Sequence, residues 1–220
     1  MKFLAIIPAR GGSKGIPNKN IIPFIGKPLI VHTIEAVKLC KHIDKIIIST
    51  DSKKISDIGI KNGVEVPFIR PAIYSSDKSL STDVLFHSID WLEKNLDYIP
   101  DAVLYLQPTS PLRTNIHIDE SMDIFNKKRP DALVSVVEVP HNYAPNKLLK
   151  IENEKLISCS SSPETSLMRR QSLPKQYARN GPAILIINTD YFLRTKQFYN
   201  GYTIPYVMSK ESSIDIDDMS

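Results

Sequence analysis

The sequence predicts an α/β fold, with a Rossmann-like, mainly parallel sheet and helices on both of its faces. Short apolar runs alternate along the chain with segments of helical period, the pattern of strands joined by crossover helices. Most of the runs are continuously apolar and rich in Ile and Val, as expected for strands that helices cover on both sides. With 220 residues and 42% hydrophobic content, residues 1–220 are expected to form a single domain.

The predicted strands are the apolar runs of about five residues. They are residues 3–7, 45–49, 102–106, 133–137, 183–187 and 204–208.

Apolar residues recur at helical spacing in residues 29–37 and 84–92, which are predicted amphipathic crossover helices. A third, shorter helix is predicted after Ser52, because serine is a favourable N-cap residue. Gly63 is well placed to end that helix at the C′ position.

The alternation fails over residues 140–182, where Pro, Asn, Ser and basic residues accumulate between two predicted strands. A segment of this length inside a compact domain is usually either disordered or a functional arm. Two short apolar pieces, residues 147–151 and 155–158, predict a hairpin and favour an ordered arm inserted into the domain.

Composition excludes several classes of function. The net charge of +4 comes from dispersed residues with no long basic run, so nucleic acid is not an expected partner. Cys40 and Cys159 are the only cysteines, which excludes a disulfide framework and a four-cysteine zinc site. No apolar run approaches a membrane span, and residues 1–7 are too short for a signal peptide. A soluble, cytoplasmic protein is expected.

A glycine-rich, basic loop follows the first predicted strand. Ligands of open parallel sheets bind beyond the carboxyl ends of the strands, where this loop is expected to lie. Its glycines allow backbone N–H groups to approach an anion, and its basic side chains add positive charge, a combination that suits a triphosphate. The loop matches neither the Walker pattern nor the dinucleotide fingerprint; an ordinary glycine-rich turn is the alternative. The candidate residues are Arg10, Gly11, Gly12, Ser13, Lys14, Lys19 and Asn20.

Gln107 directly follows a predicted strand and is flanked by Pro108 and Pro111. Its amide is expected to project from the carboxyl edge of the sheet on a restricted backbone. A buried amide that satisfies the loop backbone is the alternative.

Isoleucine and aspartate alternate over residues 214–217. The period of a strand directs the carboxylates of Asp215 and Asp217 to one face. Together with phosphate oxygens and water, they would form a natural Mg²⁺ site. A solvated strand edge is the alternative.

Sequence blocks over nearly the whole chain together resemble the N-acylneuraminate (CMP-sialic acid) cytidylyltransferase family. Residues 4–20 read LAIIPARGGSKGIPNKN and resemble the nucleotide-binding loop of that family. The further blocks, in family order, are GKPLI at 26–30, STD at 49–51, RP at 70–71, STDVL at 81–85, LQPTSPLR at 106–113, RQSLP at 170–174, NG at 180–181 and IDID at 214–217.

The resemblance implies that CMP is joined from CTP to a sialic-acid-like, nine-carbon acidic sugar, with release of pyrophosphate. Arg10, Lys14 and Lys19 would hold the phosphates, and catalysis would rest on them. Asn20, Arg70 and Ser81 would contact the base and ribose, and Gln107 would lie beside the sugar. For Arg70 the alternative is a surface ion pair, and for Ser81 a helix N-cap.

The resemblance also favours magnesium at Asp215 and Asp217, and makes residues 140–182 a dimerisation arm that reaches into the active site of the partner subunit. A homodimer is therefore expected. The arm carries a basic and aromatic cluster suited to a carboxylate-bearing sugar, although a solvated basic loop is the alternative. The cluster consists of Lys147, Arg169, Arg170, Tyr177 and Arg179.

One departure leaves the exact sugar open. The family commonly carries arginine directly after the aromatic residue aligned with Tyr177, where this chain has Ala178 and then Arg179. Legionaminate-type and pseudaminate-type sugars therefore remain alternatives, as do a relative that uses GTP and an enzyme for the eight-carbon sugar Kdo. A nucleotide-binding regulator without turnover is the alternative from another class. Beyond the position of Ser220, the family usually continues into a C-terminal helix.

Overall fold

A seven-stranded sheet runs through the computed structural model, which describes residues 1–12, 15–159 and 175–217. The strand order is β11-β6-β10-β5-β1-β4, with β9 also paired to β6. The pairs β1–β4, β1–β5 and β6–β11 are parallel, whereas β10 and β9 run antiparallel to their neighbours. The mainly parallel sheet is thereby confirmed. The strands are β1 (Phe3–Pro8), β4 (Lys45–Ser49), β5 (Ala102–Tyr105), β6 (Ala132–Glu138), β9 (Tyr177–Arg179), β10 (Leu185–Asn188) and β11 (Thr203–Met208).

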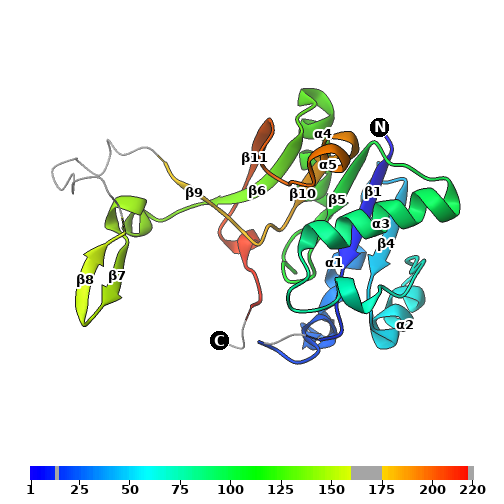
Figure 1. Cartoon of the computed structure of the whole chain (residues 1–220), viewed down its shortest axis with the longest axis horizontal. Coiled ribbons are helices and arrows are strands. Elements are labelled where there is room, and N and C mark those ends of the chain that lie inside the picture. Colours follow the sequence, from blue (N-terminus) through cyan, green and yellow to red (C-terminus); the bar gives the residue numbers. More distant parts are fainter. Residues whose placement is uncertain (13–14, 160–174, 218–220) are drawn as a thin grey trace.

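Helices cover both faces of this sheet (Figure 1). In β1, Ala5 and Ile7 pack into a core with α1, α2 and α4, while Leu4 and Ile6 face α3 and α5. Successive strand side chains point to opposite faces, so a strand between two helical layers has to be apolar throughout. Within the described residues, no helix is both long and apolar enough to cross a membrane. The helices are α1 (Leu29–Lys38), α2 (Lys53–Lys61), α3 (Ser81–Leu96), α4 (Asn115–Lys128) and α5 (Thr189–Thr195).

The ends of α2 match the sequence signals. The Ser52 side chain accepts a hydrogen bond from the Ile55 backbone N at 3.5 Å, and Gly63 follows the helix with a φ of +74°. That φ lies in the left-handed region, which glycine adopts without the steric cost of a Cβ. The predicted start and stop of this helix are confirmed.

The alternative interpretation of Ser81 as the N-cap of α3 is wrong by one residue. The helix begins at Ser81, and Leu80 occupies the N-cap position. The Leu80 backbone N donates instead to the Asp83 carboxylate at 3.1 Å. Ser81 is therefore not needed as the cap, and its hydroxyl is available for another contact.

The predicted hairpin is confirmed as β7 (Leu149–Glu152) and β8 (Lys155–Ser158). Asn153 and Glu154 join the strands with φ values of +51° and +64°, the left-handed pair that tight hairpin turns require. In Figure 1 the hairpin lies apart from the main sheet. It belongs to the part of the chain between β6 and β9. A further small ladder joins β2 (Pro23–Phe24) to β3 (Lys27–Pro28).

Residues 214–217 do not form the predicted strand. After β11 and a short 3-10 helix (Glu211–Ser213), this segment crosses the carboxyl edge of the sheet as extended chain outside any ladder. The Ile216 backbone N donates to the Thr109 carbonyl at 2.8 Å, and the Lys19 ammonium donates to the Ile216 carbonyl at 2.9 Å. These two bonds, rather than strand pairing, hold the segment in place.

Candidate active site

A pocket of about 380 Å³ opens beyond the carboxyl ends of β1 and β5, the edge at which open α/β sheets bind ligands. The loop after β1 and the segment before α3 form its walls, and the C-terminal segment reaches it through Asp217. The lining residues are Pro8, Arg10, Gly15, Lys19, Asn20, Arg70, Tyr74, Ser75, Ser76, Asp77, Ser79, Ser81, Val84, Tyr105, Gln107, Pro108, Thr109 and Asp217.

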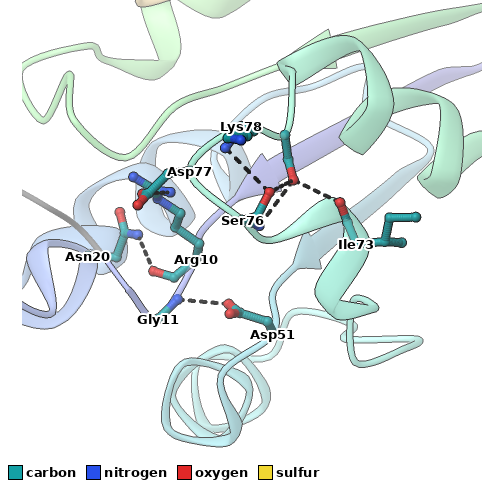
Figure 2. Close-up of polar contacts among 9 residues, drawn as sticks. Arg10, Gly11, Asn20, Asp51, Ile73, Ser76, Asp77 and Lys78 are labelled. Atoms are coloured by element: carbon teal, nitrogen blue, oxygen red, sulfur yellow. Dashed lines mark hydrogen bonds and ion pairs between the residues drawn. The ribbon is translucent and has the colours of Figure 1, made fainter.

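Two side chains fix the backbone of the loop after β1 (Figure 2). The buried Asn20 amide donates to the Arg10 carbonyl at 3.0 Å, and the Gly11 backbone N donates to the Asp51 carboxylate at 2.8 Å. A Cβ on Gly11 would lie 2.9 Å from the Cβ of Ser52, so this close approach requires glycine. The Gly11 N–H was expected to approach an anion; it is instead used within the protein.

Carboxylates from distant segments pair with the cations that this loop directs into the pocket. The Arg10 guanidinium lies 2.8 Å from the Asp77 carboxylate, and the Lys19 ammonium lies 3.2 Å from the Asp217 carboxylate. Sequence reasoning missed Asp77, which lies 67 residues from Arg10 and carries no local signal of the contact. Ser13 and Lys14 lie outside the described residues.

Arg70 is buried, with 4% of its surface exposed, so the alternative of a surface ion pair is wrong. Its Nε donates to the Ser75 hydroxyl at 3.1 Å. Burial lowers the pKa of the Arg70 guanidinium, while nearby Tyr105 and Asp51 favour its charged form. A buried cation that faces a pocket attracts an anionic ligand more strongly than an exposed one does, because solvent screens it less.

A second pocket, of about 630 Å³, adjoins the first. The two share Ser81, Tyr105, Gln107 and Asp217. Gln107 therefore lies at the carboxyl edge, as its position after β5 predicted, and at the border between the pockets. The other residues that line the second pocket are Leu80, Thr82, Arg179, Gly181, Pro182, Leu185, Phe198, Tyr199 and Asp215.

Tyr105 is a buried floor residue that sequence reasoning took only as part of a strand. Burial raises the pKa of its hydroxyl to about 12, and a side-chain hydrogen bond with Ser81 opposes that rise. The hydroxyl therefore stays protonated at neutral pH, beside Ser81 at the border of the two pockets.

The structure brings some of the predicted arm residues to a pocket and not others. Arg179 lines the second pocket and stacks over the Tyr199 ring, with 4.8 Å between the guanidinium carbon and the ring centroid. Tyr177 is half exposed in β9 and lines neither pocket. Lys147 lies in a short 3-10 helix (Pro145–Lys147) ahead of the hairpin, with its ammonium 2.9 Å from His141. Arg169 and Arg170 lie outside the described residues.

Asp215 and Asp217 both border the second pocket, in different environments. Burial raises the pKa of the Asp215 carboxyl, whose Oδ1 is buried without a hydrogen-bond partner among the described residues. The hydroxyls of Thr109 and Ser110 lie beside this carboxyl and favour its ionised form, but their hydroxyl oxygens are likewise without a partner of hydrogen-bond geometry.

The carboxylates fit a magnesium ion only together with ligands from elsewhere. The Asp217 side chain is 79% exposed, and its charge lies close enough to raise the Asp215 pKa further. In the described ranges, no three His, Cys, Asp or Glu side chains gather as a metal site. The Asp215 carboxylate, with its buried Oδ1, and the Asp217 carboxylate supply oxygen donors. Such donors suit a hard cation whose other ligands are phosphate oxygens and water.

Arg113 is a third residue whose role sequence reasoning missed. It is 2% exposed, and its guanidinium donates to the Ala183 carbonyl and the Thr33 hydroxyl, both at 2.6 Å, and to the Gln107 carbonyl at 3.1 Å. The fork of donors therefore ties the loop after β5 to β10 and α1. Arg113 therefore holds the backbone of Gln107 and lines neither pocket.

The sheet order, with its pocket at the carboxyl edge, defines an α/β fold of the nucleotidyltransferase type. A family model described as cytidylyltransferase matches residues 4–216, and the chain belongs to that family. A solved structure of CMP:2-keto-3-deoxy-manno-octonic acid synthetase, complexed with CTP, shares the fold with a TM-score of 0.72 at 14% identity, over 99% of this chain and 94% of that one.

Relatives with closer sequences carry names of nonulosonic acid enzymes. The N-acylneuraminate cytidylyltransferase of Escherichia coli is 36% identical over 99% of this chain, and the chain spans about half of that relative's length, 49%. The CMP-N,N'-diacetyllegionaminic acid synthase of Legionella pneumophila is 36% identical over 99% of this chain and 91% of its own length. The resemblance stated from the sequence blocks is thereby confirmed at the level of the family.

Proposed function

We propose that this chain transfers CMP from CTP to a sialic-acid-like nonulosonic acid and releases pyrophosphate. The observation that carries the proposal is the pair of adjoining pockets that share Ser81, Tyr105, Gln107 and Asp217. The first is rich in cations and suits a triphosphate, and the second has room for an acceptor beside it. The names of the relatives support both substrates.

In the nucleotide pocket, Arg10, Lys14 and Lys19 hold the phosphates, with the backbone of Gly11, Gly12 and Ser13 around them. Asn20, Arg70 and Ser81 face the base and ribose. The burial of Arg70 and its bond to the Ser75 hydroxyl support its role, because the guanidinium is held in place before the ligand arrives. The position of Ser81 on the border of both pockets supports its role.

In the acceptor pocket, Gln107 hydrogen-bonds the sugar and Arg179 binds its carboxylate. A guanidinium can engage both carboxylate oxygens. The Tyr199 ring restrains the guanidinium of Arg179. Lys147, Arg170 and Tyr177 belong to the acceptor site of the partner subunit in this proposal, because Lys147 and Tyr177 line neither pocket of their own chain.

The reaction is an in-line displacement at phosphorus. The anomeric hydroxyl oxygen of the sugar forms a bond to the α-phosphorus of CTP, while the bond from that phosphorus to the bridging oxygen of pyrophosphate breaks. The hydroxyl proton leaves to water, and the charge that develops on pyrophosphate is stabilised by Arg10, Lys14 and Lys19. Asp215 and Asp217 would hold a magnesium ion that neutralises phosphate charge when it is bound.

Pyrophosphate release tests the proposal. The chain is incubated with CTP or GTP and with N-acetylneuraminate, legionaminate-type, pseudaminate-type or Kdo acceptors. Release with CTP and a nine-carbon acceptor is expected. Release with Kdo alone or with GTP alone would reassign a substrate within the enzyme class. If the chain binds CTP but none of the acceptors gives pyrophosphate release, it would be a nucleotide-binding regulator.

The hairpin supports a homodimer as part of this proposal. Ile151 and Leu156 pair across β7 and β8, with exposed fractions of 76% and 70%. Leu149 and Ile157 add further exposed apolar surface to the same hairpin. A two-stranded ribbon with this much exposed apolar surface is expected to pack against a partner.

We place this enzyme in the cytoplasm, where CTP is available.

Light scattering measures the effect of placing lysine at the cross-strand pair. Ile151→Lys combined with Leu156→Lys is expected to convert a dimer into a monomer, because the contact would then bury opposed like charges. Ile60→Lys on α2 is the matched control, since Ile60 is 58% exposed outside the arm. A wild-type chain that runs as a monomer would remove the shared arm and leave the transferase proposal standing.

A further inference from the structure

Asp77 is an acidic residue in the wall of the cationic pocket (Figure 2). Its carboxylate lies 2.8 Å from the Arg10 guanidinium, and the two side chains are 45% and 34% exposed. The pocket is proposed to bind phosphates. The Asp77 carboxylate therefore already contacts the Arg10 guanidinium that a phosphate would contact.

The segment that carries Asp77 has its own internal hydrogen bonds. The Ser79 hydroxyl donates to the Ile73 carbonyl at 2.9 Å, and the Ser76 backbone N donates to the Ser79 hydroxyl at 3.0 Å. Arg70 adds a bond to the Ser75 hydroxyl. These bonds hold the segment without the contact between Asp77 and Arg10, so that ion pair can break while the segment stays folded.

Asp77 and a phosphate compete for the same guanidinium. When Arg10 turns to phosphate oxygens it leaves the carboxylate, and a carboxylate that stays nearby repels the phosphates. The ion pair is half exposed and therefore weak enough for a ligand to displace. Because the pair has to break when Arg10 turns to a phosphate, its free energy is subtracted from the binding of every ligand that uses Arg10.

We propose that Asp77 is the counter-ion that Arg10 exchanges for the phosphates of the ligand, and that its return to Arg10 promotes the departure of pyrophosphate. The proposal rests on the proposed function and adds a residue that sets phosphate affinity and product release. It assigns Asp77 no contact with the reacting atoms.

Binding of pyrophosphate, CTP and cytidine to Asp77→Asn, measured by titration calorimetry, tests the proposal. Asparagine has the same shape without the charge. Pyrophosphate and CTP are expected to bind about two- to fivefold more tightly, the range that corresponds to a weak, partly exposed ion pair. Cytidine carries no phosphate, so its binding is expected to stay unchanged. Stronger product inhibition by pyrophosphate should accompany the tighter binding.

Asp57→Asn on α2 is the matched control. Asp57 pairs with Lys53 at 2.8 Å on the surface of that helix, and the change alters the net charge by the same amount. It is expected to leave all three affinities unchanged. In an Arg10→Ala background the competition for the guanidinium is gone, so a gain that Asp77→Asn still brings measures the direct repulsion between the carboxylate and the phosphates.

The outcomes separate this inference from the proposed function. Unchanged or weaker pyrophosphate binding by Asp77→Asn, with normal CTP binding by the wild-type chain, would overturn the inference alone. An equal gain in cytidine binding would overturn it as well, since the effect would not depend on phosphate. A wild-type chain that fails to bind CTP would remove the proposed function and this inference together.

Discussion

Changing Asp215 and Asp217 together to asparagine is expected to abolish magnesium-dependent pyrophosphate release. Neutral amides are poor ligands for a hard divalent cation. The buried Asp215 Oδ1, without a hydrogen-bond partner among the described residues, is the donor most in need of a cation. The measurement is the initial rate over a magnesium titration, together with calorimetric binding of CTP at low and high magnesium.

The control for the double change is Asp57→Asn with Asp123→Asn, which alters the net charge equally on the helices α2 and α4. Those positions lie outside both pockets, so turnover should be retained. Because Asp217 also pairs with Lys19, the double variant removes that ion pair, while the Lys19 ammonium keeps its bond to the Ile216 carbonyl. Magnesium-free CTP binding is therefore expected to weaken less than magnesium-dependent binding. An unchanged magnesium response would mean that the metal binds elsewhere.

Local patterns were sufficient to predict most of the sheet and the helices α1, α2 and α3, whereas α4 and α5 were not predicted. Strands such as β1 and β4 are continuous apolar runs, because a layer of helices covers each of their faces. Ser52 and Gly63 marked both ends of α2 through properties of single residues. The strand β9 was not predicted, because its three residues are exposed and carry no periodic pattern.

The ion pairs of the site could not be predicted, because they join distant parts of the chain. Lys19 and Asp217 are 198 residues apart, and their contact depends on the path of the chain after β11. Alternation over residues 214–217 predicted a strand, but backbone bonds to Thr109 and Lys19 can hold an extended segment just as well. Asp215 and Asp217 do border the same pocket, but no strand directs their carboxylates to a common face.

Burial also decided which interpretation of a residue holds. The sequence favoured a functional Arg70, with a surface ion pair as the alternative, and only the burial of its side chain in the folded chain excludes that alternative. Arg113 belongs to a block that carried the family resemblance, yet its donors point to backbone carbonyls and to Thr33. A motif identifies the residues of a site without distinguishing those that face the ligand from those that hold the site together.

Arg10→Ala is expected to lower kcat/KM for CTP by at least about 100-fold, the scale seen when a preorganised charge stabiliser is removed. The loop that carries Arg10 is held at the pocket by two side chains. The Asn20 amide donates to the Arg10 carbonyl, and the Asp51 carboxylate accepts from the Gly11 backbone N. Charge that develops on pyrophosphate would lose that donor and would face the Asp77 carboxylate instead. The fold should be retained, since Arg10 is partly exposed and its ion pair contributes about 1 kcal/mol or less.

Steady-state kinetics and thermal melting of Arg10→Ala, Arg10→Lys and the double variant Arg10→Ala with Asp77→Asn measure this effect. Lysine keeps the charge without the planar fork of donors, so an intermediate rate is expected. The double variant should recover only a small part of the loss, because removing the repulsion of Asp77 does not restore a donor for pyrophosphate. Turnover within about threefold of wild type in a folded Arg10→Ala protein would remove Arg10 from the catalytic machinery. Near-complete recovery in the double variant would mean that Arg10 acts mainly by neutralising Asp77 rather than by binding phosphate.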